Sequence, residues 1–252
     1  MEKFIKDGLK VEIYDNRALM GEAAAKDIKA CFQTLLSNKK EINVIFAAAP
    51  SQNDVLKALV EDKDIEWQRI NAYHMDEYIG LKTGAPQAFG NFLNEHIFSL
   101  VPFKSVNYIN ANAQDYDAEA DRYAALLKEN KPDAVVLGIG ENGHIAFNDP
   151  DVADFNDKKA VKAVKLDEIC RQQQVNDGCF DEIDDVPTHA LTLTVPTLVS
   201  AAHLFCIVPC STKAKAVRET VHAEINEKCP ATVLRKHGDV TLYLDKDSAS
   251  LL

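Results

Sequence analysis

The chain alternates short apolar runs, rich in β-branched residues, with longer stretches of helical periodicity. The runs typical of strands are INVIFAAA (42–49), VNYI (106–109), AVVLGI (134–139), ALTLTV (190–195), LFCIV (204–208) and VTLYL (240–244). Helical periodicity marks residues 18–36, 117–130 and 212–225. Because the strand runs are apolar on both faces, this alternation predicts an α/β fold in which helices flank a mostly parallel sheet. Ligands of such sheets bind at the carboxyl ends of the strands, so functional residues are expected just after them.

The length and composition of the chain favour one domain. With 252 residues, 46% of them hydrophobic, the chain can bury one large core. No internal repeat, low-complexity segment or linker rich in Pro, Gly and Ser divides it. We therefore expect a single domain over residues 1–252. The least patterned region, residues 150–187, is rich in Asp and is predicted to be irregular, as a lid or an insertion.

The charge excludes several classes of partner. A formal net charge of -11 would repel extended nucleic acid and anionic membranes, so no nucleic-acid or membrane partner is expected. The amino-terminal sequence has no apolar core of signal-peptide length, and no transmembrane-length apolar run occurs, which predicts a soluble, cytoplasmic protein. The six cysteines form no C-x-x-C pair, so we expect reduced and mostly buried thiols.

The sequence GIGENGHIAFNDP (138–150) follows one of the predicted strands, and its first six residues fit G-x-G-x-x-G. A dinucleotide site would need a helix that begins at the last glycine, with its free N–H groups on a pyrophosphate. Pro150 follows too soon for such a helix, because proline disfavours helical geometry at the residue before it. The alternative is that glycines such as Gly138 and Gly140 let the backbone approach a small ligand.

The same stretch contains a histidine and a carboxylate that could act together. Histidine can take and return a proton near neutral pH, and a carboxylate on its far nitrogen fixes the tautomer and stabilises the imidazolium. His144 and Asp149 are therefore candidates for a general base and the group that orients it. A structural histidine that caps backbone groups of the loop is the simpler alternative.

A second group of polar residues lies in NAYHMDEYIGL (71–81), after a short strand expected at 65–70. His74, Asp76 and Glu77 stand there among aromatic and apolar residues. A carboxylate in partly apolar surroundings has a raised pKa, which suits Asp76 to moving a proton to and from carbon. A surface turn or an ion pair would explain the same residues. The spacing of these histidines and carboxylates is not that of a metal site, so we expect no catalytic metal.

A third segment, LFCIVPCSTKAKAV (204–217), predicts a strand followed by a helix that begins with Lys213. Lysine in the first turn of a helix opposes the helix dipole. An anion such as phosphate, held by Lys213, the hydroxyls of Ser211 and Thr212 and free N–H groups, would remove that conflict. A solvated lysine is the alternative.

Two further segments could contact an anion. In FAAAPSQNDVLKAL (46–59), Ser51 stands near the start of a predicted helix, where it could bind an anion or simply cap the helix. In ICRQQQVNDGCF (169–180), Arg171 and three glutamines form a polar cluster. Arg171 could clamp a phosphate, although a surface salt bridge would explain it equally well.

Several of these motifs together resemble the glucosamine-6-phosphate deaminase (isomerase) family, whose relatives include the 6-phosphogluconolactonases. The resemblance is carried by MDEYIGL (75–81), GENGHIAFNDP (140–150), the VP-x-x-ALT-x-TVPTL stretch (186–198) and STKAKAV (211–217). Lactonases typically have Asp-Gly-His-Thr-Ala in the catalytic loop and lack F-N-[DE]-P, so the sequence is more similar to the deaminases. The family resemblance implies a modified Rossmann-like three-layer fold with neither a metal nor a nucleotide cofactor.

The resemblance also implies a reaction and roles for the residues that match. The substrate class is a 2-amino-2-deoxyhexose 6-phosphate, either glucosamine or galactosamine 6-phosphate, which is isomerised to a ketohexose 6-phosphate with loss of ammonia. His144 would assist ring opening, with Asp149 orienting it. Asp76 would carry the C2 proton to C1, and Lys213 would bind the phosphate. Family members occur as single subunits and as larger assemblies, so a homo-oligomer is compatible with the resemblance.

Three departures from the family pattern stand out. The phosphate turn reads AAAPSQ instead of a glycine- and threonine-rich sequence, which leaves Ser51 and backbone N–H groups for that task. The expected arginine is out of register, with Arg171 as a candidate replacement. Asn142 replaces an aspartate that helps to position the histidine, and Asp149 stands where a glutamate is often found. Asparagine accepts a hydrogen bond but adds no charge to stabilise an imidazolium.

Two alternatives remain open at this point. One is a lactonase that uses His144 as a base for water and has no need of Asp76. The other is a non-catalytic sugar-phosphate-binding protein, for which Asn142 is the motivating residue.

Overall fold

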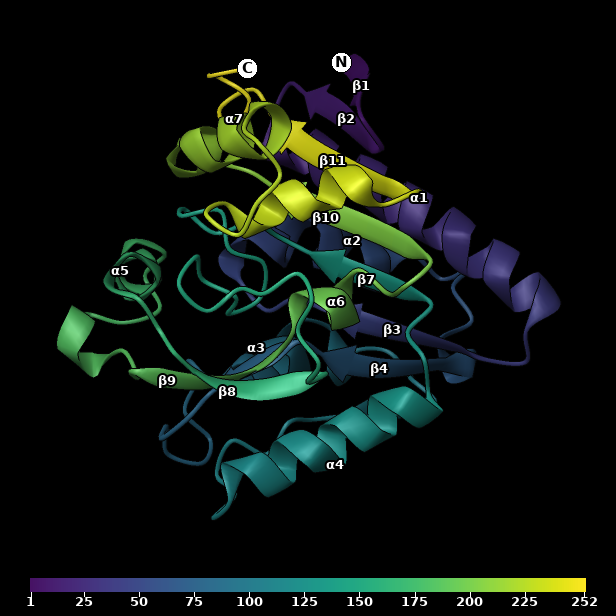
Figure 1. The fold of residues 1–252 in the computed structure, drawn as a ribbon. Helices are drawn as coiled ribbons and strands as arrows, with labels where there is room; N and C mark the ends of the chain where they lie inside the picture. Colours follow the sequence, from purple (N-terminus) through teal and green to yellow (C-terminus); the bar gives the residue numbers. More distant parts are fainter.

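The computed structural model describes residues 1–252, and its main sheet has eight strands (Figure 1). In spatial order they are β1 (Glu2–Lys6), β2 (Leu9–Tyr14), β11 (Val240–Asp245), β10 (His203–Val208), β7 (Ala134–Leu137), β3 (Ile42–Phe46), β4 (Ile70–His74) and β6 (Ser105–Asn107). Only the β1–β2 pair is antiparallel. From β6 to β11 the strands follow the Rossmann order, which reverses between β3 and β7. The predicted α/β fold with a mostly parallel sheet is confirmed.

A second, antiparallel sheet lies beside the main one. It consists of β5 (Asp76–Tyr78), β9 (His189–Leu193) and β8 (Val161–Lys165). The sequence pattern did not indicate this sheet, and the run at 190–195 forms its central strand instead of joining the parallel sheet. The strand expected at 65–70 is also wrong, because residues Trp67–Arg69 form a 3₁₀ turn and β4 begins at Ile70.

Helices cover both faces of the main sheet. They are α1 (Arg17–Asn38), α2 (Asn53–Glu61), α3 (Phe89–Leu93), α4 (Tyr116–Glu129), α5 (Glu168–Asn176), α6 (Val195–Leu198) and α7 (Ala214–His222). Successive side chains of a strand enter different hydrophobic clusters, since they point to opposite faces. Val44 packs in the cluster that contains α1 and α2 residues, whereas Ile45 packs in the cluster that contains α4 and α7 residues. The molecule therefore has the expected three layers, with core on both sides of the sheet.

The segment 150–187 is more regular than its composition predicts. It contains β8 and α5, and Asp167 caps α5 by accepting the N–H of Cys170 at 2.6 Å. This segment runs from the end of the glycine-rich turn to the second sheet, and α5 stands beside the cavity described below. Its role as a lid stays a prediction.

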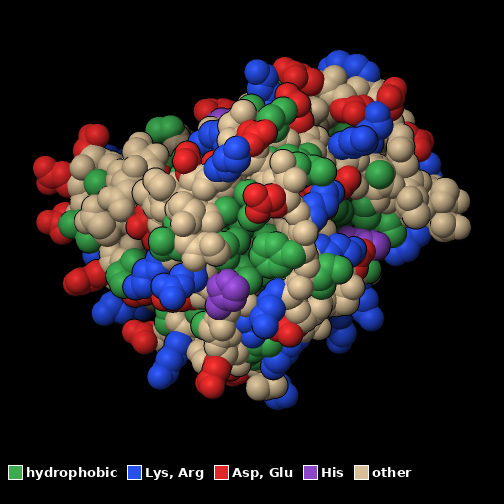
Figure 2. Space-filling model, turned by 90° about the horizontal axis from the view of Figure 1, so that it is seen from above, with side chains coloured by type: hydrophobic (Ala, Val, Ile, Leu, Met, Phe, Trp, Pro, Cys, Tyr) green, Lys and Arg blue, Asp and Glu red, His purple; other side chains and the backbone are tan.

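Charges of both signs are mixed on the surface. On the face seen in Figure 2, Lys and Arg side chains are interspersed with Asp and Glu. None of the helices is both long and apolar enough to cross a membrane.

Candidate active site

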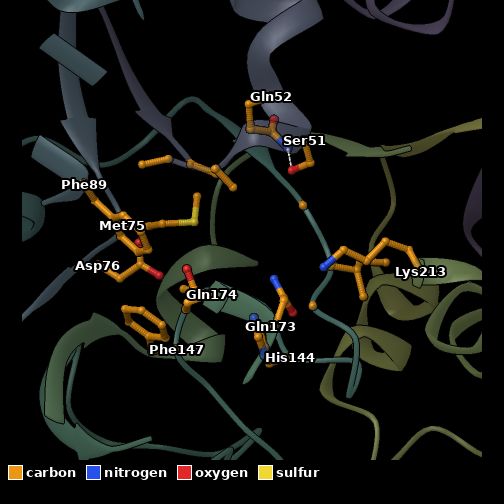
Figure 3. Close-up of a pocket in the computed structure, with 17 residues that line it drawn as sticks. Ser51, Gln52, Met75, Asp76, Phe89, His144, Phe147, Gln173, Gln174 and Lys213 are labelled. Atoms are coloured by element: carbon orange, nitrogen blue, oxygen red, sulfur yellow. Dashed lines mark hydrogen bonds between the residues drawn. The ribbon is translucent and has the colours of Figure 1, made fainter. Parts of the chain in front are cut away.

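A cavity that is partly open to solvent lies where the strand order reverses. Its walls come from the segments that follow β3, β4, β7 and β10 and from α5 (Figure 3). Its position fits a small-molecule site at the topological switch point of an α/β sheet. The residues used in the argument below are Ser51, Gln52, Asp76, Gly138, Gly140, His144, Gln173, Gln174 and Lys213.

The glycine-rich turn after β7 folds back on itself and forms no helix. The N–H of Gly140 donates to the His144 carbonyl at 2.9 Å, and the N–H of Gly143 donates to the Gly140 carbonyl at 3.0 Å. Gly143 has a φ of 84°, which is why the tight turn requires glycine. No helix follows Gly143, as the position of Pro150 predicted, so the turn lacks the helix that would hold a pyrophosphate.

His144 and Asp149 come together at the end of this turn. Nδ1 of His144 lies 3.0 Å from Oδ1 of Asp149, although the direction of approach is not that of an aligned hydrogen bond. Burial opposes ionisation of Asp149, but the contact with His144 and hydrogen bonds from Asn142 and Asp167 outweigh it and hold the pKa of Asp149 below its usual range. The carboxylate is therefore charged at neutral pH, as an orienting partner for histidine must be.

Asn142 has a role that its sequence position did not reveal. Its Nδ2 donates to Oδ1 of Asp149 at 3.0 Å and to Oδ2 of Asp167 at 2.8 Å, and its Oδ1 accepts the backbone N–H of His144 at 3.0 Å. An aspartate at this position could make only the last of these bonds. Asn142 thus holds two carboxylates side by side, and Asp149 is left as the carboxylate that contacts the histidine.

Asp76 presents a carboxyl group without protein partners. It is 6% exposed, and no hydrogen bond or ion pair of the structure includes its side chain. Burial, followed by the nearby charge of Glu77, raises the pKa of Asp76 well above its usual value. Glu77 itself accepts the N–H groups of Tyr78, Phe89 and Gly90 and so anchors the start of α3. The neighbouring carboxyls therefore have different tasks, and only that of Asp76 lines the cavity.

His74 is separate from the site. Its Nε2 accepts the N–H of Ile109 at 2.7 Å, and burial lowers the pKa of His74 to about 3. The ring at the end of β4 is therefore a neutral part of the core, and it does not line the cavity that Asp76 enters.

Lys213 extends into the cavity from the opposite side to Asp76 (Figure 3). It is only 4% exposed, and no carboxylate lies within ion-pair distance of its ammonium group. Burial lowers the pKa of Lys213. A buried cation without a partner is unfavourable unless a ligand supplies the anion. The hydroxyl-bearing Ser211 and Thr212, expected beside it, are exposed and do not line the cavity.

The AAAPSQ turn after β3 lies at the same end of the cavity as Lys213. Ser51 accepts a hydrogen bond from Nε2 of Gln52 at 3.0 Å, so its own hydroxyl hydrogen is free for a ligand. The turn is held by Arg17, whose guanidinium binds Oδ2 of Asp54 at 2.6 Å and the Pro50 carbonyl at 2.9 Å. Neither Gln52 nor Arg17 stood out in the sequence, because glutamine and a helix-starting arginine have many other uses.

Arg171 does not point into the cavity. Its guanidinium donates to the carbonyls of Ile183 and Val186, at 2.5 and 2.9 Å, and so holds the end of the 150–187 segment against α5. The glutamines that follow it, Gln173 and Gln174, line the cavity instead. The structure therefore gives no support to Arg171 as a phosphate clamp, and we leave it out of the proposed site.

Comparisons with known proteins give one consistent result. Residues 15–243 match the family model described as glucosamine-6-phosphate isomerases/6-phosphogluconolactonase. A glucosamine-6-phosphate deaminase of Streptococcus sanguinis is 33% identical over 97% of this chain and 99% of its own. A glucosamine-6-phosphate deaminase of Listeria monocytogenes is 35% identical over 84% of this chain and 88% of its own.

Solved structures agree with these similarities. A monomeric glucosamine-6-phosphate deaminase superimposes with a TM-score of 0.87 at 29% identity, over 96% of this chain and 99% of its own. A 6-phosphogluconolactonase from Thermotoga maritima shares the fold, with a TM-score of 0.76 at 19% identity, over 94% of this chain and 100% of its own.

Proposed function

Because the chain belongs to the glucosamine-6-phosphate isomerase/6-phosphogluconolactonase family, we propose that it converts glucosamine 6-phosphate into a ketohexose 6-phosphate and ammonia. The observation that carries this proposal is that one cavity brings three functional side chains together. Asp76 offers a buried, unpartnered carboxyl with a raised pKa, and the same cavity contains His144 and the free ammonium of Lys213. Lactone hydrolysis needs a base for water but no second base for a carbon acid.

The first step assigned to the site is opening of the pyranose ring. His144, oriented by the charged Asp149, passes a proton from the anomeric hydroxyl to the ring oxygen. The C1–O5 bond breaks and C1 becomes an aldehyde. Lys213 and Ser51 hold the phosphate at the other end of the cavity, where an anion satisfies the buried ammonium.

The second step is proton transfer between carbons. The ionised form of Asp76 removes the proton from C2 while the C1 carbonyl oxygen takes up a proton from solvent, which leaves an enolamine. Asp76 then returns its proton to C1 as the nitrogen loses one to solvent. The resulting C2 imine takes up water and releases ammonia, which leaves the C2 ketone. Water is consumed in breaking a carbon–nitrogen bond, so we place the overall reaction among the hydrolases. The raised pKa of Asp76 makes it a stronger base than an exposed carboxylate.

One assay tests the proposed function. The purified protein is incubated with glucosamine 6-phosphate and, separately, with galactosamine 6-phosphate, and both ammonia and ketohexose 6-phosphate are measured. We expect both products from glucosamine 6-phosphate, and propose galactosamine 6-phosphate as a second substrate. Binding of the sugar phosphates without release of ammonia would contradict the enzyme and support the binding protein. We also propose a cytoplasmic location, since the substrate is a charged and soluble metabolite.

Replacing Gly140 with alanine is expected to lower kcat/KM by about 10²-fold, because the new methyl group displaces the histidine ring. A Cβ at this position would lie 2.1 Å from Cε1 and 2.2 Å from Nε2 of His144. The matched control is Gly238→Ala, since a Cβ at Gly238 has no atom within 4 Å. Steady-state kinetics of both variants would check this, and equal activities would show that the ring position is not critical.

Replacing Lys213 with methionine is expected to raise KM by about 10- to 100-fold, through loss of a charge-assisted contact to phosphate. The same change should leave the protein as stable or more stable. The pKa of Lys213 is lowered by burial, so at neutral pH the folded state carries an unfavourable charge that methionine removes. Lys215→Met, on the exposed side of α7, is the control with the same change in net charge. A KM unchanged by Lys213→Met would show that the lysine does not bind the phosphate.

A further inference from the structure

A cysteine of the 150–187 segment lies against the His144–Asp149 pair. Ligand atoms of Cys170, His144 and Asp149 all lie within 4.8 Å of one another. Cys170 belongs to the first turn of α5, whereas the other two residues come from the glycine-rich turn. All three are buried, with 1%, 8% and 0% of their surfaces exposed. The fold thus brings a thiol, an imidazole and a carboxylate from two segments into one cluster.

The three groups are chemically suited to hold a cation together. Nδ1 of His144 is buried and has no aligned hydrogen bond, so its lone pair is available in one tautomer. Sulfur, imidazole nitrogen and carboxylate oxygen are the ligands that zinc uses in proteins. Zinc bonds of about 2.0–2.3 Å place tetrahedral ligand atoms about 3.5 Å apart, so only a small movement of the Cys170 side chain is needed.

The electrostatics of the cluster also favour a dication. Asn142 holds the carboxylates of Asp149 and Asp167 together at the cluster, which makes the electric field there negative. The same negative field attracts a divalent cation, and a bound cation stabilises the thiolate in turn. The cavity reaches the ring of His144, which provides the route of entry from solvent.

We propose that Zn²⁺ binds between the glycine-rich turn and α5, with His144, Asp149 and Cys170 as ligands, and inhibits the enzyme reversibly. Binding forms a zinc–sulfur bond and releases the thiol proton to solvent. The bound cation occupies the histidine and carboxylate that open the ring, and it ties α5 to the turn. The inhibition rests on the proposed function, whereas the binding site does not.

Cation binding is measured first, on the full chain and without substrate. Zn²⁺ is titrated in competition with a chromogenic chelator, and Co²⁺ is used as a spectroscopic probe because a cysteine thiolate gives it a charge-transfer band. The test variant is Cys170→Ser, and the control is Cys179→Ser, a half-buried cysteine of the same segment outside the cluster. We expect the wild type and Cys179→Ser to bind one equivalent and to show the band. Cys170→Ser should lose the band and bind at least roughly tenfold more weakly.

Inhibition is measured second, with glucosamine 6-phosphate. Zn²⁺ should inhibit the wild type and Cys179→Ser, and a chelator should restore their activity. Cys170→Ser should keep its activity in the presence of Zn²⁺. A Cys170→Ser protein that binds Zn²⁺ as tightly as the wild type, with the band intact, would overturn the site. If no form of the protein releases ammonia, the proposed function fails, while the binding measurements still decide the site.

Discussion

Replacing Asp76 with asparagine is expected to lower kcat/KM for glucosamine 6-phosphate by about 10²- to 10⁴-fold, because the amide cannot accept the C2 proton. The side chain makes no hydrogen bond or ion pair, so the isosteric change leaves the surrounding contacts in place. In deuterated water the wild type should incorporate deuterium from solvent at the carbons between which the proton moves. The variant should incorporate none.

The same variant separates the deaminase from the lactonase alternative. A lactonase would use His144 as a base for water, so Asp76→Asn should leave hydrolysis of 6-phosphogluconolactone unchanged. Loss of deuterium exchange together with loss of ammonia release is expected only for the isomerase. Wild-type turnover of the amino sugar by Asp76→Asn would refute the assigned role of this carboxyl.

A stability measurement shows whether Asp76→Asn loses activity only because it unfolds. The pKa of Asp76 is raised in the folded state, so the folded protein binds more protons than the unfolded chain. The contribution of this group to stability is full below its unfolded pKa and is lost as pH rises through its folded pKa. Asparagine does not titrate, so the stability of the variant does not fall with pH for this reason. The free energy of unfolding of Asp76→Asn, relative to the wild type, should therefore increase from about pH 5 to about pH 8 in urea titrations.

Replacing Asn142 with aspartate is expected to lower the free energy of unfolding by about 3 kcal/mol or more near pH 8, since two hydrogen bonds to charged groups are lost. The Nδ2 atom of Asn142 is the donor to both Asp149 and Asp167. An aspartate there would place three carboxylates together, and activity should fall with the displaced Asp149.

The stability deficit of Asn142→Asp is expected to grow as pH rises. The introduced carboxylate lies between two others, so its pKa is raised and the folded state retains its proton more readily than the unfolded chain. The deficit in stability should be small near pH 5 and should grow as pH rises. Urea unfolding at several pH values measures it. A deficit that does not depend on pH would contradict the explanation by charge.

A double variant supplies the matched control. Asp167→Asn returns an N–H donor to the cluster. The single side-chain oxygen of the asparagine can still accept the N–H of Cys170, which caps α5. Combined with Asn142→Asp, Asp167→Asn should recover much of the lost stability. The two substitutions should therefore be coupled in a double-mutant cycle. Additive losses would show that Asn142 and Asp167 do not act through their shared hydrogen bond.

Much of the fold could be predicted because its causes are local. Runs apolar on both faces must be buried on both faces, and this requires helices above and below a parallel sheet. β5 was missed because three residues, two of them acidic, are too few to show a strand pattern, and β8 was missed because its five residues alternate irregularly between buried and exposed. Those strands exist because β9 pairs with both of them, which is a long-range contact.

Several residues of the candidate site could also be predicted from the sequence. Asp76, His144 and Lys213 follow predicted or observed strands, so the topology alone brings them to one edge of the sheet. Arg171 could not be excluded in advance, since the carbonyls that it binds lie 12 and 15 residues further along the chain. The sequence also gave no indication that Cys170 lies beside His144 and Asp149.

The sequence by itself determined the glycine-rich turn. Pro150 denies it a helix, and Gly143 supplies the positive φ that the turn requires, because both effects act through the local backbone. Only the tertiary structure decided how the charges in and around the site are compensated. Asn142 joins Asp149 to Asp167, which lies 25 residues after Asn142, and Lys213 is buried with no carboxylate in an ion pair with it. Charge compensation depends on the distances between charged side chains and on their burial, and neither can be read from the spacing of residues along the chain.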